Sequence, residues 1–153
     1  MATRLKTDQT ISRFVDSERG LVSREIFFDG EIYKKELERI FARVWLYLAH
    51  ETQIPNPGDF VTNYMGEDPV IVSRDGAGRI RVFLNSCRHR GMKICRADGG
   101  NARQFTCSFH GWTYSNDGRL AGVPMQEASY GENFDRSGWG LIEAPKIASY
   151  GGM

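Results

Sequence analysis

Apolar and polar positions follow two different patterns along the 153 residues. Residues 1–20 are mostly polar and charged, and we interpret them as an arm with one short helix near Ile11–Val15. From about Gly30 to Tyr47, large apolar residues recur at the three- and four-residue spacing of an amphipathic helix. Asp29 precedes this stretch and suits an N-terminal cap. We therefore predict a helix over 30–47 whose apolar face packs against other parts of the protein.

After residue 58 the pattern changes to short runs of β-branched and aromatic residues, separated by Gly, Asn and Asp. The expected strands are Phe60–Met65, Val70–Arg74, Ile80–Asn85, Gln104–Cys107, Trp112–Ser115 and Arg119–Val123, with further candidates at Leu141–Glu143 and Lys146–Tyr150. Turns at Asp75–Gly78 and Asn116–Gly118 are expected to join neighbouring strands as hairpins. The sequence predicts a mainly β fold, an antiparallel β-sandwich at 49–153, preceded by an arm and a helix at 1–48.

Composition and charge exclude several classes of protein. Hydrophobic residues make up 41% and charged residues 25% of the chain, which is ordinary for a folded domain. A net charge of +1 argues against a nucleic-acid partner held by bulk charge. No run of about 18 apolar residues predicts a membrane span, and the polar start lacks the features of a secretory signal. Three cysteines do not make a disulfide framework, so we expect a cytoplasmic protein.

Four of the six Cys and His residues fall in two matched segments. Cys87 and His89 form a Cys-x-His pair, and Cys107 and His110 form a Cys-x-x-His pair. Each pair follows an expected strand and is followed closely by glycine, which permits a tight turn. Two thiolates and two imidazoles suit zinc or an iron–sulfur cluster. Because each segment supplies one ligand of each kind, the pattern favours a two-iron cluster over a zinc finger, with zinc and coincidence as the alternatives.

The segments Cys87–Met92 and His110–Trp112 resemble the cluster-binding loops of Rieske non-heme iron aromatic-ring-hydroxylating dioxygenases. The similarity is to the N-terminal Rieske portion of the large (alpha) subunit, of the naphthalene and biphenyl dioxygenase type. Other segments that carry this resemblance are Leu37–Phe41 leading to Trp45, Pro57–Phe60, Val70–Arg74 and Gly122–Pro124. The resemblance implies that 49–153 is a Rieske [2Fe–2S] domain of β-sandwich fold.

The resemblance also implies the roles of the four residues. Cys87 and Cys107 are expected to bind the inner iron of the cluster as thiolates. His89 and His110 are expected to bind the outer iron, closer to the surface. These four side chains are the predicted metal and cofactor ligands, and the sequence predicts no catalytic residue within this chain.

The family's chemistry implies partners beyond the chain. Electrons from NADH would pass through a reductase or a ferredoxin to the cluster, and then to a mononuclear Fe(II) that supports dihydroxylation of an aromatic hydrocarbon. Only His50 and the carboxylates remain once the cluster ligands are assigned, so the second iron is expected in a catalytic domain beyond this chain. We therefore expect a piece of a larger subunit, not catalytically competent alone. The resemblance implies that the intact protein is a homotrimer or an α3β3 assembly with a beta subunit. The alternative is a free-standing Rieske ferredoxin.

Residues next to the predicted ligands suggest how the cluster is tuned. High-potential Rieske proteins carry an extra Cys in each loop, where this chain has Met92 and Phe109, so we expect a low midpoint potential. Arg88 and Arg90 predict a cationic edge suited to an acidic electron donor. Trp112 is expected to shield the cluster from water or to pack beside it.

Two residues of the same types are left over. Cys95 lies among apolar neighbours and is expected to be a small packed side chain. His50 lies just after the predicted helix, and we expect it to stabilise the C-terminus of that helix or to be exposed.

Overall fold

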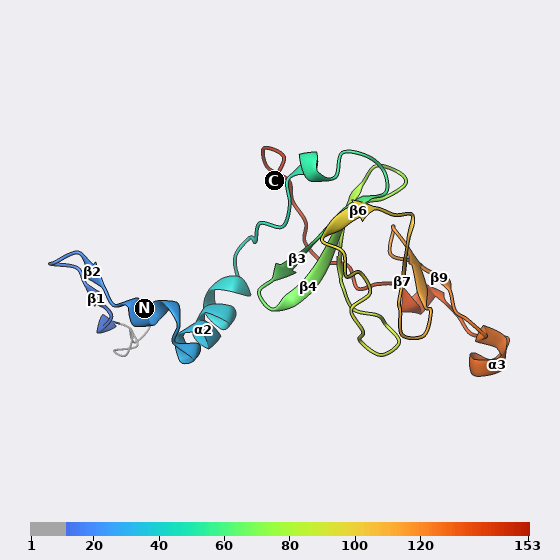
Figure 1. Cartoon of the computed structure of the whole chain (residues 1–153), viewed down its shortest axis with the longest axis horizontal. Helices are drawn as coiled ribbons and strands as arrows, with labels where there is room; N and C mark the ends of the chain where they lie inside the picture. Colours follow the sequence, from blue (N-terminus) through green and yellow to red (C-terminus); the bar gives the residue numbers. More distant parts are fainter. Residues whose placement is uncertain (1–11) are drawn as a thin grey trace, which may run out of the picture. The chain divides into compact units, whose positions relative to one another are not determined.

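The computed structural model describes residues 12–153. The chain divides into two compact units, Met1–Trp45 and Leu46–Met153. Figure 1 shows the whole chain coloured along its sequence.

The first unit contains a short hairpin and a helical segment. Strand β1 (Val15–Asp16) pairs antiparallel with β2 (Leu21–Val22), and the 3-10 turn η1 (Arg24–Phe27) follows. The short helix expected near Ile11–Val15 lies partly outside the described residues, and its last position instead begins β1. Helix α2 (Gly30–Glu36) continues into the π-helical turn η2 (Leu37–Phe41).

The predicted helix cap is confirmed, but the predicted length of the helix is wrong. The carboxylate of Asp29 accepts hydrogen bonds from the backbone N–H groups of Glu31 and Ile32, at 2.8 and 3.0 Å. The helical segment ends at Phe41, where the side chain of Arg43 donates to the carbonyl of Glu38 at 2.9 Å and so satisfies one of the free end groups. Neither α2 nor η2 contains a buried residue within this unit, so the packing of the apolar face against other parts of the protein stays a prediction.

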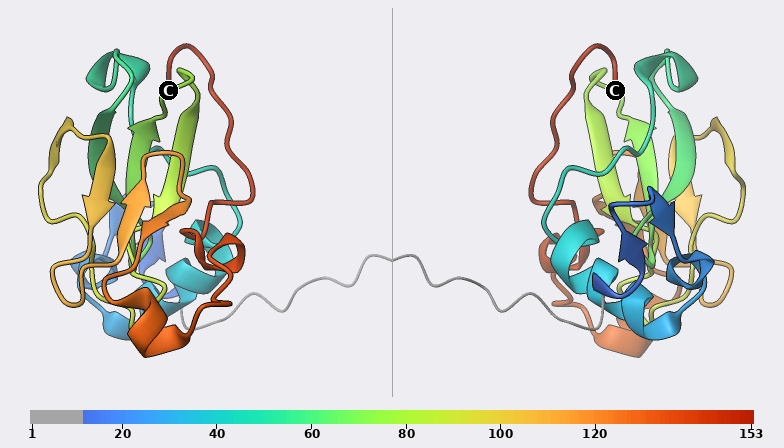
Figure 2. Two further views of the ribbon diagram at one scale, coloured as in Figure 1. Left: turned by 90° about the vertical axis from the view of Figure 1, so that its right-hand side faces the viewer. Right: turned by 90° about the vertical axis from the view of Figure 1, so that its left-hand side faces the viewer.

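The second unit consists of two antiparallel sheets (Figures 1 and 2). One sheet has the strand order β5-β4-β3-β6, with β3 (Asp59–Met65), β4 (Asp68–Arg74), β5 (Ile80–Leu84) and β6 (Gly99–Asn101). The other has the order β7-β8-β9, with β7 (Gln104–Thr106), β8 (Thr113–Ser115) and β9 (Leu120–Gly122). The mainly β, antiparallel fold predicted from the alternating runs is thus confirmed.

The main core lies between the two sheets. Because successive side chains of a strand point to opposite faces, a central strand can contribute to a core on each side of its sheet. Ile71 of β4 and Phe83 of β5 belong to one buried cluster with side chains of the other sheet, namely Phe105, Tyr114 and Leu120. The alternate positions of β4 belong to a second cluster on the opposite face, formed by Ile54, Val70, Val72 and Val82. Strand β4 is therefore buried on both faces and organises the unit.

Three elements differ from the sequence-based expectation. Strand β6 was not predicted, because its Gly-Gly-Asn sequence has little β propensity and forms a strand by pairing with β3. Helix α3 (Gln126–Tyr130) was also not predicted, since five residues are too few for a helical period to show. Of the two candidate strands near the end, 141–143 makes one bridge, from Glu143 to Phe83, and 146–150 forms no strand.

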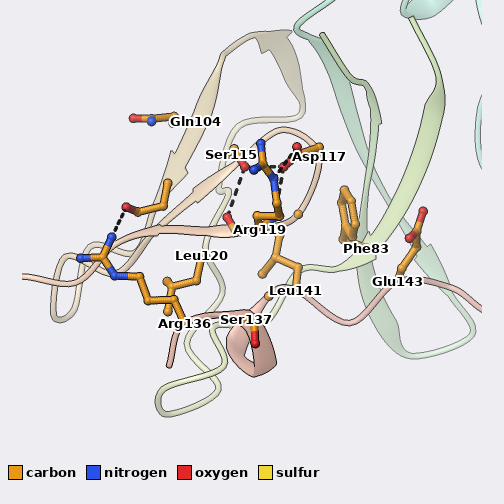
Figure 3. Close-up of a pocket in the computed structure, with 13 residues that line it drawn as sticks. Phe83, Gln104, Ser115, Asp117, Arg119, Leu120, Arg136, Ser137, Leu141 and Glu143 are labelled. Atoms are coloured by element: carbon orange, nitrogen blue, oxygen red, sulfur yellow. Dashed lines mark hydrogen bonds and ion pairs between the residues drawn. The ribbon is translucent and has the colours of Figure 1, made fainter. Parts of the chain in front are cut away.

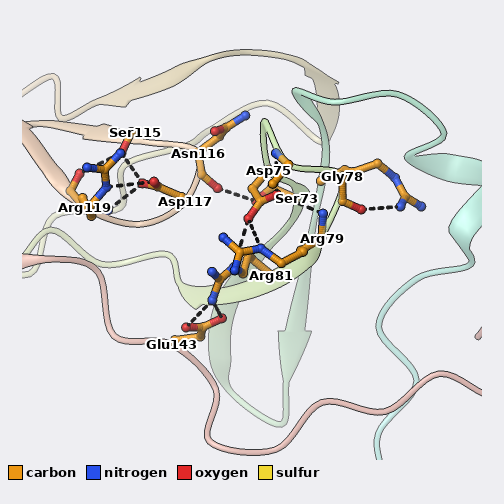
Figure 4. Close-up of polar contacts among 12 residues, drawn as sticks. Ser73, Asp75, Gly78, Arg79, Arg81, Ser115, Asn116, Asp117, Arg119 and Glu143 are labelled. Atoms are coloured by element: carbon orange, nitrogen blue, oxygen red, sulfur yellow. Dashed lines mark hydrogen bonds and ion pairs between the residues drawn. The ribbon is translucent and has the colours of Figure 1, made fainter.

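A buried carboxylate closes the predicted Asp75–Gly78 hairpin turn between β4 and β5 (Figure 4). Asp75 accepts hydrogen bonds from the backbone N–H groups of Ala77 and Arg79, both at 2.9 Å. Burial alone would raise the pKa of Asp75, but bonds from Arg79 and Arg81 bring it below its ordinary value of 3.8. Arg81 also pairs with Glu143 at 2.8 Å, so this ionised network ties segment 141–143 to β5.

Two loops with the same backbone hydrogen bonds extend from the two sheets. In the first loop (87–92), the N–H of Cys87 donates to the carbonyl of Met92, and the N–H of Gly91 donates to the carbonyl of Cys87. In the second loop (107–112), the corresponding bonds run from Cys107 to Trp112 and from Gly111 to Cys107. All four N···O distances lie between 2.8 and 2.9 Å.

The second bond of each loop, from the glycine N–H to the cysteine carbonyl, requires a glycine in the left-handed region. Gly91 has φ +73° and Gly111 has φ +74°, a conformation that costs other residues about 1–2 kcal/mol. The surroundings differ, because a Cβ on Gly111 would lie 2.7 Å from Cγ of Pro124, whereas a Cβ on Gly91 would meet nothing closer than 3.9 Å.

This contrast gives a matched pair of substitutions. Gly91→Ala should lower the free energy of unfolding by about 1–2 kcal/mol through backbone strain alone. Gly111→Ala should cost more, because the new methyl group also displaces Pro124 or the second loop. Thermal or urea unfolding of both variants measures the difference. Equal destabilisation would show that the contact with Pro124 does not restrain this loop.

Candidate metal centre

The two cysteines of the loops lie at the edge of the main core. Cys87 is 3% exposed and Cys107 is 2% exposed, and both belong to the buried cluster that joins the sheets. Both are free thiols. The hydroxyl of Tyr114, from β8, lies 3.3 Å from Sγ of Cys87 and accepts the backbone N–H of Arg88 at 3.0 Å. The first loop is thus tied to the strand that follows the second loop.

The two histidine rings lie against one another. The ring centroids of His89 and His110 lie 4.5 Å apart, with the planes at 72°, and both residues are half-buried. The Nδ1 atom of each ring is buried and has no hydrogen-bond partner in the structure. A buried polar atom without a partner costs about 1–3 kcal/mol, so two such atoms in facing rings indicate a group that both would bind.

Aromatic side chains enclose the histidines. Trp112, which is 2% exposed, stacks on His89 with centroids 5.1 Å apart and planes at 9°. Phe109 covers His110 at 3.8 Å and is itself 55% exposed. Trp112 also contacts a group of aromatic rings after β9, namely Tyr130, Phe134 and Trp139. This agrees with the expectation that Trp112 packs beside the site.

The surroundings of the site shift the pKa values of His89 and Tyr114. Burial lowers the pKa of His89 below its ordinary value of 6.5, and the nearby charges of His110 and Arg90 act in the same direction. Neutral imidazole is the ligating form of histidine. Burial, and then the bond to Cys87, raises the pKa of Tyr114 above its ordinary value of 10.0. Because its oxygen accepts from Arg88, the phenol proton is available to Sγ of Cys87.

The predicted cationic edge is formed only in part. Arg90 is exposed, as expected. Arg88 is half-buried, its Nε atom is buried without a partner, and its guanidinium lies 6.0 Å from the ring of Trp139. Arg88 therefore belongs to the aromatic surroundings of the site as well as to its surface.

The two leftover residues lie outside the site. Cys95 is 7% exposed and packs in the core, as expected, where burial raises the pKa of its thiol. The expectation for His50 is wrong, because the helical segment ends nine positions before it, at Phe41. Instead, Nδ1 of His50 accepts the backbone N–H of Thr52 at 3.3 Å and caps the 3-10 turn η3 (Glu51–Gln53).

One structural residue of the site was missed by sequence reasoning. Asn85 is 1% exposed and follows β5, just before the first loop. Its side chain accepts from the N–H groups of Ile94 and Cys95 and donates to the carbonyl of Cys95, at 2.7–3.0 Å. It fixes the return of the first loop. The sequence signal for this role is a polar Asn at the end of an apolar strand, just before the first loop.

The pocket of Figure 3 lies elsewhere, beside the hairpin of β8 and β9, with a volume of about 530 Å³. None of the four predicted ligands lines it. Its charged groups are already engaged, since Arg119 pairs with Asp117 at 2.8 Å and Arg136 donates to the carbonyl of Ala121 at 2.7 Å. The two loops, and not this pocket, are the candidate site.

Two thiols and two imidazoles form a donor set that suits zinc or an iron–sulfur cluster. A single structural zinc ion needs four side chains at one point. Among residues 12–153, no three Cys, His, Asp or Glu side chains are grouped so as to hold one ion. A two-iron cluster of the Rieske type needs two cysteines on one iron and two histidines on the other, and the two loops carry that number of each. Within the same residues, no helix is long and apolar enough to cross a bilayer.

Comparisons with known proteins point to the same chemistry. The model of the Rieske [2Fe-2S] domain family matches residues 44–149. Biphenyl 2,3-dioxygenase subunit alpha of Rhodococcus jostii is 53% identical over 146 residues, which cover 95% of this chain and 31% of that protein. N,N-dimethyl phenylurea N-demethylase subunit alpha of a Sphingobium species is 46% identical, covering 89% of this chain and 30% of that protein.

Solved structures agree with the sequence relatives. Naphthalene 1,2-dioxygenase from a Rhodococcus species, bound to indole, superimposes with a TM-score of 0.83 at 48% identity, covering 94% of this chain and 33% of that chain. The chain thus spans about a third of the length of the relatives that it matches. The family match over most of the second unit, together with the paired loops, shows that this chain belongs to the Rieske [2Fe-2S] domain family.

Proposed function

We propose that this chain is the electron-transfer domain of a ring-hydroxylating dioxygenase alpha subunit. Its [2Fe–2S] cluster would be held by the thiolates of Cys87 and Cys107 and by Nδ1 of His89 and His110. The observation that carries this proposal is the pair of buried, unpartnered Nδ1 atoms in two adjoining rings, in loops that also carry two buried free thiols. When bound, such a cluster accepts and donates one electron at a time.

The residues around the cluster would control its stability and potential. The core around Cys87 and Cys107 excludes water from the thiolate side. With Cys87 as a thiolate, the hydroxyl of Tyr114 would donate a hydrogen bond to its Sγ, which would favour the more negative, reduced state. Trp112 and Phe109 pack against the two imidazole rings. The histidines are nevertheless half-buried while the two cysteines are buried, so the histidine side lies nearer to solvent. Electrons would therefore enter and leave most readily through the histidines.

The larger reaction is inferred from the relatives. We infer that a ferredoxin or a reductase that uses NADH supplies the electrons, and that a mononuclear iron in the rest of the subunit receives them for attack on an aromatic ring. We also infer the trimeric or α3β3 assembly expected from the sequence. Relatives named for ring dioxygenation and for N-demethylation match this chain at 53% and 46% identity. Such similarity fits a domain that delivers electrons rather than one that selects a substrate.

Replacing the proposed ligands tests the assignment, with the third cysteine as an internal control. Cys107→Ala should abolish the iron–sulfur absorption of the purified chain, because one inner ligand is lost. Cys95→Ala removes an equally buried thiol that we place outside the site, so its spectrum should match that of the unsubstituted chain. His110→Cys should weaken or alter the cluster while leaving the core folded. An unchanged spectrum in Cys107→Ala or His110→Cys would remove that residue from the ligand set.

The midpoint potential should lie near the low end of the Rieske range, about −150 mV. High-potential Rieske proteins carry a disulfide-bonded cysteine at the positions of Met92 and Phe109, so this chain cannot form that disulfide. Cys87 and Cys107 are free thiols. Protein-film voltammetry of the chain measures the potential directly. A midpoint well above about 0 mV would contradict the assignment to the low-potential group.

Tyr114→Phe tests the hydrogen bond to Cys87. Loss of the hydroxyl and its hydrogen bond should destabilise the reduced cluster and lower the midpoint potential by up to about 60 mV. That shift corresponds to a tenfold change in the one-electron reduction equilibrium. Tyr64→Phe is the matched control, because that ring is 55% exposed on β3. A potential that stays constant or rises in Tyr114→Phe would show that the hydroxyl does not donate to the thiolate.

A further inference from the structure

We infer that Tyr130 is a positioning residue for His89, holding the imidazole in the orientation that presents Nδ1 to the cluster. The hydroxyl of Tyr130 lies 3.3 Å from Nε2 of His89. This inference rests on the proposed role of His89 as an iron ligand. It adds a residue from α3, an element well separated in sequence from both loops.

The direction of the hydrogen bond follows from the ligand assignment. If Nδ1 of His89 binds iron, the neutral ring carries its proton on Nε2 and can only donate there. The phenol oxygen of Tyr130 is then the acceptor. Ligating histidines commonly donate their second N–H to such a partner, which fixes the ring and makes it a stronger donor to the metal.

The packing around His89 supports a role in orientation. Trp112 stacks on one face of the ring, at 5.1 Å. His110 meets the ring edge to face, at 4.5 Å. Tyr130 completes the enclosure at Nε2, and its own ring is held by Trp112 and Phe134 at 5.9 and 4.9 Å. Rotation of the imidazole would break the hydrogen bond and the stacking contact together.

The two histidines differ in this respect. His110 is covered by Phe109, but no residue in the described part of the chain forms a hydrogen bond with it. An effect of Tyr130 transmitted through this bond should therefore appear at one histidine and not at both. That asymmetry separates a positioning role from a general loosening of the domain, which would disturb both rings.

The test compares Tyr130→Phe with two other variants of the cluster-loaded chain. Tyr150→Phe is the matched control, because that side chain is 86% exposed. Tyr130→Leu removes the ring as well as the hydroxyl. Each protein is labelled with ¹⁵N-histidine and reduced, and pulsed EPR then measures the hyperfine coupling of each iron-bound nitrogen. The midpoint potential is measured at one fixed pH.

Tyr130→Phe should change the coupling of one histidine nitrogen only. The reduction equilibrium should also shift by up to tenfold toward the reduced cluster, because a weaker donor ligand favours that state. This shift corresponds to a rise in the midpoint potential of up to about 59 mV. Tyr150→Phe should change neither quantity. Unchanged coupling and potential in Tyr130→Phe would overturn the inference, and so would a change seen only in Tyr130→Leu, since packing alone would then be responsible. A chain without histidine couplings in its unsubstituted form would overturn the proposed function as well.

Discussion

The constraint on which the second unit depends is that two thiols and two imidazole nitrogens are buried at the edge of its core. Thiols can be buried there at little cost, because they behave as small apolar groups. Burial of the two Nδ1 atoms costs free energy, because neither has a hydrogen-bond partner. A bound cluster would relieve that cost. Binding of the proposed cluster would therefore be coupled to folding, since binding free energy at a site that the unfolded chain lacks is also folding free energy.

The two sheets supply the site through equivalent loops rather than through one contiguous motif. Each loop is closed by a bond from the N–H of its cysteine and by a left-handed glycine. The loops differ by one residue in the position of the histidine, at 89 and at 110, two and three residues after the cysteine. Tyr114 and Asn85 join this frame to the core by hydrogen bonds to both the thiol and the backbone. The ligand positions are thus set by backbone geometry and not by side-chain choice alone.

The strands and the paired loops could be predicted from sequence because their signals are local. Alternating runs predicted β3, β4 and β5, and the two Cys and His pairs predicted which loops would meet. Features that depend on distant partners were not predicted. Strand β6 forms from a Gly-Gly-Asn segment only beside β3, and Tyr130 gains a role only through its contact with His89. The helix over 30–47 was predicted too long, because the apolar spacing continues beyond Phe41 although the helix does not.

Metal and sulfide analysis of the purified chain shows whether the paired loops hold two iron ions. We expect two iron ions and two acid-labile sulfides for each chain, with no stoichiometric zinc. A colourless chain that contains one zinc ion and no sulfide would contradict this expectation.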